Sequence, residues 1–157
     1  MSPVDLKQVV HDVERILTAD AVFKNISLHL DLPASLPTII GNRTQLIQAL
    51  MNLVLNAFDS VCENGDGPRE VTIWVKENET GEARIAVRDS GKGIAPEIMP
   101  RLFEAFFTTK PNGMGMGLAI TRSIIENHGG RLRATPNADR GATLHFTLPI
   151  VDGGDTN

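Results

Sequence analysis

The sequence has one cysteine, Cys62, among 157 residues. A single cysteine excludes an internal disulfide framework and a cysteine-based metal site, and it favours a reducing compartment. No apolar run approaches the roughly 20 residues that cross a bilayer, and the beginning of the chain is not typical of a signal peptide. We therefore expect a soluble, cytoplasmic domain. A start at Met1 is also compatible with a piece of a longer membrane protein.

A strong excess of either charge sign is also missing. The chain carries 19 acidic and 15 basic residues, a net charge of −4, which gives no reason to expect nucleic acid or acidic lipid as a partner. The length suits one domain with a real core, and neither repeats nor a clear linker divide it. We expect one domain over residues 1–150 and a disordered tail over residues 151–157.

Hydrophobic periodicity predicts alternating helices and strands. Helical spacing covers residues 4–21, and Asn42 with Gln45 three residues later is typical of the start of a helix over residues 43–61. A short helix is expected over residues 96–103 and a longer one over residues 117–127. Period-two patterns predict strands over residues 26–32, 71–76, 83–87, 131–135 and 143–148. The order of these elements indicates an α/β domain.

Two glycine-rich segments lie close together in the chain. Asp89-Ser90-Gly91-Lys92-Gly93 follows a predicted strand, and Gly113-Met114-Gly115-Met116-Gly117-Leu118 leads into a predicted helix. Glycine has no Cβ, so its backbone N–H groups can approach a ligand closely. A helix that begins directly after such a loop offers unpaired N–H groups to an anion. Together the two segments indicate a nucleotide site.

Three common glycine-loop sites do not fit the spacing. A dinucleotide-binding fingerprint needs its third glycine at position 118, which is Leu118. A P-loop needs serine or threonine after its lysine, whereas Gly93 follows Lys92. A protein-kinase catalytic loop beginning at Arg88-Asp89 lacks the required asparagine, because position 94 is Ile94.

Asn52 and Asn56 are four residues apart, which places them on one face of the helix predicted over residues 43–61. Buried asparagine side chains cost free energy unless they are hydrogen-bonded or bound to a ligand. The pair therefore either caps neighbouring loops inside the domain or contacts a ligand, and the spacing alone leaves both open.

In their order along the chain, five segments resemble the motifs of the catalytic and ATP-binding domain of sensor histidine kinases. They are an N box at 52–57, a G1 box at 89–93, an F box at 102–110, a G2 box at 113–118 and a final Gly-x-Thr strand at 141–146. Each motif is weak alone, but five in family order are specific. The resemblance covers about residues 4–149.

The resemblance implies an α/β two-layer sandwich of the Bergerat type: a mixed, mostly antiparallel sheet of about five strands, with three main helices on one face. It implies that ATP or ADP binds with Mg²⁺ on the helical side. Asn56 would be the Mg²⁺ ligand, since a carboxamide oxygen suits a hard cation. Asp89 would accept a hydrogen bond from the adenine amino group, which guanine lacks at that position.

The resemblance also implies contacts along the rest of the nucleotide. Lys110 would neutralise phosphate charge and is, with Asn56, the second expected catalytic residue. At Asp59 many relatives have a lysine, so one phosphate contact of the family is missing. The remaining expected contacts are Asn52, Gly91, Gly93, Ile94, Phe103, Thr108, Thr109, Gly113, Gly115, Gly117, Leu118 and Thr143.

Within the superfamily, the resemblance favours phosphoryl transfer over hydrolysis. Hydrolysing members have a glutamate four residues before the Mg²⁺-binding asparagine, and here that residue is Asn52, which cannot act as a general base. The implied acceptor is a histidine on a separate dimerisation and phosphoacceptor domain, with a response regulator downstream. A binding module without phosphotransfer and a self-contained ATPase remain alternatives. The domain alone is expected to be monomeric, without contacts to nucleic acid or membrane.

The histidines of the chain are not expected to carry the phosphoryl group. His11-Asp12 is superficially similar to the acceptor motif, but Glu14 and Ile16 occupy positions where the motif requires other residues. We therefore expect His11 to face solvent. His128 and His145 have no spacing typical of a metal site and are expected in surface or loop positions, whereas Trp74 is expected in the core.

Overall fold

The computed structural model describes residues 1–63, 65, 67–104 and 117–151. Within these residues three α-helices occur: α1 (Leu6–Phe23), α2 (Arg43–Cys62) and α3 (Gly117–Asn127). A short 3-10 helix, η1, covers Met99–Arg101. The strands are β1 (Ser2–Asp5), β2 (Ser27–Asp31), β3 (Thr38–Gly41), β4 (Glu70–Glu77), β5 (Glu82–Asp89), β6 (Leu132–Pro136) and β7 (Ala142–Pro149).

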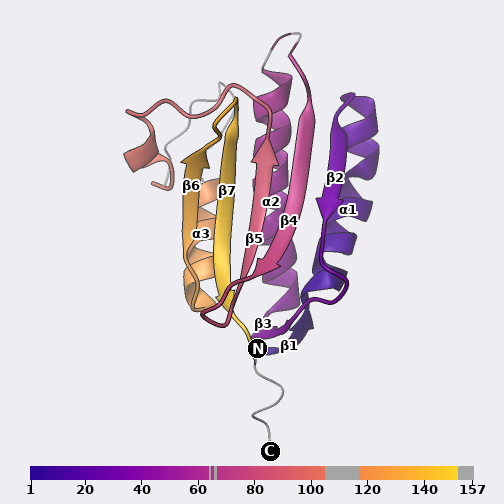
Figure 1. Cartoon of the computed structure of the whole chain (residues 1–157), viewed down its shortest axis with the longest axis vertical. Coiled ribbons are helices and arrows are strands. Elements are labelled where there is room, and N and C mark those ends of the chain that lie inside the picture. Colours follow the sequence, from indigo (N-terminus) through magenta and orange to yellow (C-terminus); the bar gives the residue numbers. More distant parts are fainter. Residues whose placement is uncertain (64, 66, 105–116, 152–157) are drawn as a thin grey trace, which may run out of the picture.

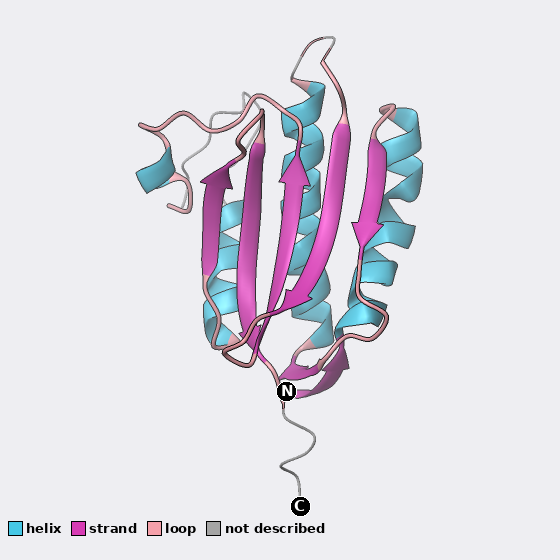
Figure 2. Ribbon diagram, in the orientation of Figure 1, coloured by secondary structure: helices cyan, strands magenta, loops and turns pink. Residues whose placement is uncertain are grey.

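Five strands form one sheet in the order β2-β4-β5-β7-β6. Only β2 and β4 pair in parallel, and the other neighbours in this sheet are antiparallel. The three helices all lie on one face of the sheet (Figures 1 and 2). This arrangement confirms the predicted two-layer α/β sandwich with a mixed, mostly antiparallel sheet.

A second, two-stranded sheet lies beside the ends of α1 and α2, where β1 pairs antiparallel with β3. The sequence pattern placed residues 4 and 5 in a helix, but they belong to β1. Helix α1 begins at Leu6 because the Asp5 side chain accepts a hydrogen bond from the Lys7 backbone N–H at 3.0 Å and so caps the helix. Such a local cap is invisible to apolar spacing.

The core lies between the helices and the sheet. Helix α2 begins as predicted, with Asn42 Oδ1 accepting from Gln45 N at 3.0 Å, and Phe58 on this helix is fully buried. On the sheet side, alternate residues of the β4–β5 hairpin face the helices, as shown by the buried pair Ile73 and Val87 in the register. The core is therefore formed between two layers, the helices and the helical face of the five-stranded sheet.

Trp74 and two histidines occupy environments that differ from the predictions. Trp74 is half-buried, on the sheet face that the helices leave uncovered, because its neighbours Ile73 and Val75 face the core. His128 and His145 are buried, with 8% and 6% of their surfaces exposed. The predicted surface or loop position is wrong for His145, which lies inside β7, whereas His128 lies in the turn after α3 but is not on the surface. His128 Nε2 accepts from Asn42 N at 3.0 Å, and this contact ties the end of α3 to the start of α2.

Beyond residue 150, where the predicted domain ends, the structure describes one more residue. Val151, which was assigned to the tail, donates from its backbone N–H to Thr38 O at 3.0 Å. Residues 152–157 lie outside the described residues.

The helix expected over residues 96–103 is reduced to the single turn η1. Among the described residues, no helix is long and apolar enough to cross a membrane.

Candidate functional site

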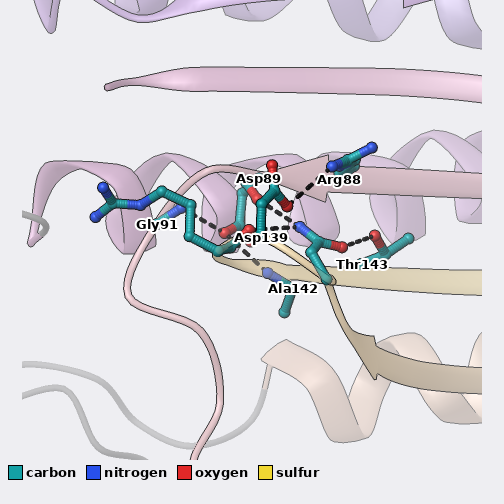
Figure 3. Close-up of polar contacts among 8 residues, drawn as sticks. Arg88, Asp89, Gly91, Asp139, Ala142 and Thr143 are labelled. Atoms are coloured by element: carbon teal, nitrogen blue, oxygen red, sulfur yellow. Dashed lines mark hydrogen bonds and ion pairs between the residues drawn. The ribbon is translucent and has the colours of Figure 1, made fainter. Parts of the chain in front are cut away.

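Asp89 ends strand β5 on the helical face of the sheet, and only 6% of its surface is exposed. Its Oδ1 accepts hydrogen bonds from the backbone N–H groups of Gly91 at 2.9 Å and Ala142 at 3.4 Å (Figure 3). The Ser60 hydroxyl of α2 lies 3.5 Å from the same oxygen. The carboxyl group is therefore held from three directions through one of its two oxygens.

The electrostatics of Asp89 are those of a buried acid without a counter-ion. Burial raises the pKa of Asp89, and the hydrogen bonds from Gly91, Ala142 and Ser60 only partly oppose this shift. Among the described residues, no Lys, Arg or His forms an ion pair with Asp89, and the described hydrogen bonds all reach Oδ1. Oδ2 is thus left as an acceptor for a ligand N–H group.

The turn between β6 and β7 fixes the backbone of Asp89. The Asn137 side chain donates at 2.9 Å to both Asp89 O and Arg140 O, and its Oδ1 accepts from Thr143 Oγ1 at 2.6 Å. Gly141 has φ +81°, and a Cβ there would come 2.0 Å from Asp89 O. Sequence reasoning missed Asn137, whose only signal is an asparagine four residues before the glycine of a predicted turn.

Thr143 does not share the environment of Asp89. It pairs with Arg88 in the register, on the face of the sheet away from the helices, and its hydroxyl is bound to Asn137. The residue of the Gly-x-Thr motif that reaches Asp89 is Ala142, through its backbone N–H. The Thr143 hydroxyl therefore donates to Asn137, and the predicted ligand contact of Thr143 stays a prediction.

The first glycine-rich segment packs closely against α2. A Cβ at Gly91 would lie 2.2 Å from Ser60 Oγ and 2.7 Å from Ser60 C, so only glycine allows this approach. Gly93 has φ +82°, a left-handed conformation that glycine adopts without strain. Lys92, between them, forms an ion pair with Glu63 at 2.5 Å. These glycines place the loop, and Ile94 beyond it packs against the core.

A polar stripe on α2 connects the two ends of the candidate site. Asn52 Nδ2 donates to Thr121 Oγ1 at 3.2 Å and to Gly117 O at 3.4 Å, at the start of α3. Ser60, eight residues later and about 12 Å along the helix axis, reaches Asp89. Asn56 is half-buried midway between them. Of the two alternatives for the asparagine pair, hydrogen bonding inside the domain therefore holds for the side-chain nitrogen of Asn52, which is bonded to the start of α3.

The second glycine-rich segment is described only from Gly117 onward. Gly117 is exposed, and a Cβ placed on it would meet no atom of the described residues within 4 Å. The first-turn N–H groups of α3 lack helical partners and suit an anion. Leu118 and Phe103 are partly buried against the core. The predicted contacts at Thr108, Thr109, Lys110, Gly113 and Gly115 lie outside the described residues.

Three groups thus follow one another along one side of α2: Asp89, Asn56 and the start of α3. An acceptor for an N–H group lies at one end, a carboxamide in the middle, and the first-turn N–H groups of α3 at the other end. Among the described residues, no cluster of three His, Cys, Asp or Glu could hold a metal ion by itself. Asn56 is a single hard donor, which fits a Mg²⁺ ion held mainly by phosphates and water.

Comparisons with known proteins agree on one family. Residues 41–152 match the family described as histidine kinase-, DNA gyrase B- and HSP90-like ATPase. The sensor protein FixL of Bradyrhizobium diazoefficiens is 37% identical over 147 residues, which cover 94% of this chain and 29% of FixL. The nucleotide-free catalytic domain of histidine kinase ThkA is similar with a TM-score of 0.84 at 29% identity, covering 95% of both chains.

Two further structures show such a domain in a larger context. Full-length ShkA in complex with AMPPNP is 29% identical, with a TM-score of 0.84, and the match covers 97% of this chain and 31% of ShkA. ThkA in complex with the response regulator protein TrrA is 26% identical, with a TM-score of 0.80, covering 96% of this chain and 42% of that one. The chain therefore spans about a third of the length of FixL and ShkA.

Proposed function

Because the chain belongs to the family of histidine kinase-, DNA gyrase B- and HSP90-like ATPases, as a domain of the sensor histidine kinase type, we propose that it transfers the γ-phosphoryl group of MgATP to a histidine on a separate domain. One observation carries the assignment of the site. Asp89 is a buried carboxylate that has no cation beside it among the described residues, with Oδ2 left as an acceptor and a polar stripe leading from it to the start of α3.

Asp89 would select adenine. Its ionised Oδ2 accepts a hydrogen bond from the adenine amino group, whereas guanine presents a carbonyl oxygen there and would leave two acceptors facing each other. A buried polar group without a partner costs about 1–3 kcal/mol, so the wrong base is rejected by that penalty. The contacts from Gly91 and Ala142 hold Oδ1 in place and keep the carboxyl plane fixed.

Asn56 and the start of α3 would hold the triphosphate end. Mg²⁺ supplies neutralisation of the phosphate charge when bound, and Asn56 would provide a carboxamide oxygen to it. The first N–H groups of α3 face the phosphates, and Asn52 supports that helix end through Thr121 and Gly117. Lys110 is proposed as the further phosphate contact.

Transfer is favoured over hydrolysis by what occupies position 52. Asn52 cannot take a proton from water near neutral pH, and general-base help is worth typically 10²–10⁴-fold in rate. Its nitrogen is already used at the start of α3. The domain therefore positions and neutralises the phosphoryl group, and the base beside the acceptor histidine belongs to the phosphoacceptor domain.

The proposed partners are the dimerisation and phosphoacceptor domain of the whole protein and a cognate response regulator. The relatives support this proposal, since ThkA has been captured with the response regulator protein TrrA. A cytoplasmic location follows from the need for ATP and suits the free thiol of Cys62.

The decisive experiment mixes this chain with a fragment of the whole protein that carries the acceptor histidine, together with γ-radiolabelled ATP and Mg²⁺. We expect acid-labile label on the fragment and little release of free phosphate. The variant Asn56→Ala should lose labelling, whereas Asn78→Ala, in the β4–β5 turn, should keep it. Phosphate release that outpaces labelling would instead show a self-contained ATPase, and ATP binding without label would show a binding module.

A further inference from the structure

The face of the sheet that the helices leave uncovered carries a group of cations, although the chain as a whole is acidic. Lys76 on β4, Arg84 on β5 and Arg133 on β6 alternate with core residues of their strands and are exposed. We call these three residues the basic face. Figure 1 shows the sheet from this side, with α1, α2 and α3 behind it.

Aromatic and imidazole groups join the basic face into one surface. Lys76 Nζ lies 4.9 Å and Arg84 Cζ 5.7 Å from the centroid of the Trp74 ring. Arg84 Nη2 lies 3.2 Å from His145 Nδ1. In the register Trp74 pairs with Ala86, Ala86 with His145 and His145 with Arg133, so the surface crosses four strands.

The cations of the basic face have no carboxylate partner among the described residues. Arg88, on the same face, does form an ion pair, with Asp139 at 3.1 Å. In a chain with 19 acidic residues against 15 basic ones, three neighbouring cations without such a pair are unexpected. Burial, then Arg84 and Arg133, lower the pKa of His145, which is consistent with a positive potential across this surface.

We propose that the basic face docks an acidic segment of a partner protein, whose carboxylates pair with Arg84 and Arg133. A guanidinium group presents a planar pair of N–H donors that matches a carboxylate. Arg84 on β5 and Arg133 on β6 have β7 between them, so they favour two acidic side chains about 10 Å apart, the width of two strand spacings. The ring of Trp74 offers an apolar surface beside them for the aliphatic parts of such a segment. The surface lies on the opposite side of the sheet from Asp89 and is independent of the nucleotide site.

Nucleic acid fits this surface less well. A sheet that binds single strands stacks successive bases on several aromatic side chains, whereas the described strands place a single tryptophan, Trp74, on this face, already beside Lys76 and Arg84. Asp31 on β2 and Glu70 on β4 are acidic residues on the β2 side of this face. They would repel any anion that extended toward β2, so they restrict the proposed acidic segment to the part of the sheet over β5, β7 and β6.

Trp74 supplies the measurement, because it is the only tryptophan of the chain. The probe is a peptide of alternating glutamate and serine, titrated into the chain at low salt while tryptophan fluorescence is recorded. We expect a saturable change that weakens with added salt. A lysine–serine peptide of the same length should give none. The double variant Arg84→Gln with Arg133→Gln should bind the acidic peptide roughly fivefold more weakly, as expected for two exposed ion pairs.

A matched double variant separates a docking site from net charge. Lys7→Gln with Arg122→Gln removes the same charge from exposed positions on α1 and α3 and should leave the peptide affinity unchanged. Arg84→Lys with Arg133→Lys keeps the charge and should retain most of the binding, and MgATP affinity reports correct folding of every variant. The proposal is overturned if no saturable change occurs, or if both glutamine variants weaken binding equally. It is equally overturned if oligothymidylate binds more tightly than the peptide, or if sedimentation shows self-association that the Arg84→Gln with Arg133→Gln variant abolishes.

Discussion

Two buried aspartates of this domain have opposite surroundings. Asp12 on α1 is 9% exposed and forms ion pairs with Arg15 and with Arg43 of α2. Asp89 at the end of β5 is 6% exposed, and among the described residues it has hydrogen-bond donors but no cation. The same side chain at similar burial thus joins two helices in one place and remains uncompensated in the other.

The difference separates structural acids from ligand-binding acids. The charge of Asp12 is balanced within the chain, so its contribution is to the fold. The charge of Asp89 is costly in the free protein, as the raised pKa indicates, and a ligand N–H group would relieve that cost. Substitutions at and around the two residues should therefore separate stability from nucleotide affinity.

The largest effect on stability is expected at Gly141, whose backbone packs directly against Asp89. In Gly141→Ala the new Cβ would come 2.0 Å from Asp89 O and 2.8 Å from Asp89 Oδ1, at φ +81°. We expect a loss of more than about 3 kcal/mol in the free energy of unfolding, because a backbone clash adds to left-handed strain. Gly81→Ala is the control, since Gly81 has φ +82° and an added Cβ would meet no atom of the described residues within 4 Å; it should lose about 1 kcal/mol. If urea unfolding shows the same loss of stability in Gly141→Ala and Gly81→Ala, the proposed close packing of Gly141 against Asp89 is wrong.

Asp12→Asn tests the structural acid. The change leaves Arg15 and Arg43 without their common carboxylate, and we expect a loss of about 1–2 kcal/mol in the free energy of unfolding, below the full value for a buried pair because both arginines are largely exposed. MgATP affinity, measured by calorimetry on folded protein, should not change. A fall in that affinity would show that the two aspartates are not separable.

Asn137→Ala tests the link between the β6–β7 turn and Asp89. The variant loses the donors to Asp89 O and Arg140 O and the acceptor for Thr143. We expect a loss of about 1 kcal/mol in stability and a several-fold fall in MgATP affinity, because the carboxyl group is less well fixed. Asn78→Ala, in the β4–β5 turn, should cost similar stability with unchanged affinity. Equal MgATP affinities in Asn137→Ala and Asn78→Ala would show that Asn137 does not position Asp89 for nucleotide binding.

The smallest effect concerns His145 on the opposite face of the sheet. Its pKa is lowered in the folded chain, so the unfolded chain binds a proton more readily. Stability is therefore lost as the pH falls from about 6.5 through the folded pKa. His145→Gln should flatten this part of the stability–pH curve, measured by urea unfolding. An unchanged slope would mean that His145 does not titrate differently in the folded state.

The fold was largely predictable because periodicity records which side of an element is buried. The helices over residues 43–61 and 117–127 and the β4–β5 hairpin follow this rule. Strand β1 was missed because four residues are too few to show a period-two pattern. The position of Trp74 was missed because an aromatic side chain suits either face of a sheet. The burial of His128 depends on a contact with Asn42, 86 residues away, which no local pattern contains.

The candidate site was predictable as a set of motifs but not as a geometry. Asp89 and Asn56 were identified from motif order, and the placement of Asp89 beside Ser60 is consistent with the predicted role. The register of β7 decides that Ala142, rather than Thr143, faces Asp89, and a shift of one residue reverses that choice. Asn137 was missed because a turn asparagine is ordinary until its partner is known.

The central claim is that Asp89 reads the adenine base, and calorimetry on Asp89→Asn tests it most directly. Wild-type protein should bind MgATP about 100-fold more tightly than MgGTP, and Asp89→Asn should lose a similar factor for MgATP. Because the pKa of Asp89 is raised in the folded protein, the free energy of unfolding falls as the pH rises above the ordinary pKa of an aspartate. Without nucleotide, the Asp89→Asn variant should therefore be at least as stable as wild type at neutral pH. Unchanged MgATP affinity in a folded Asp89→Asn variant would contradict the account.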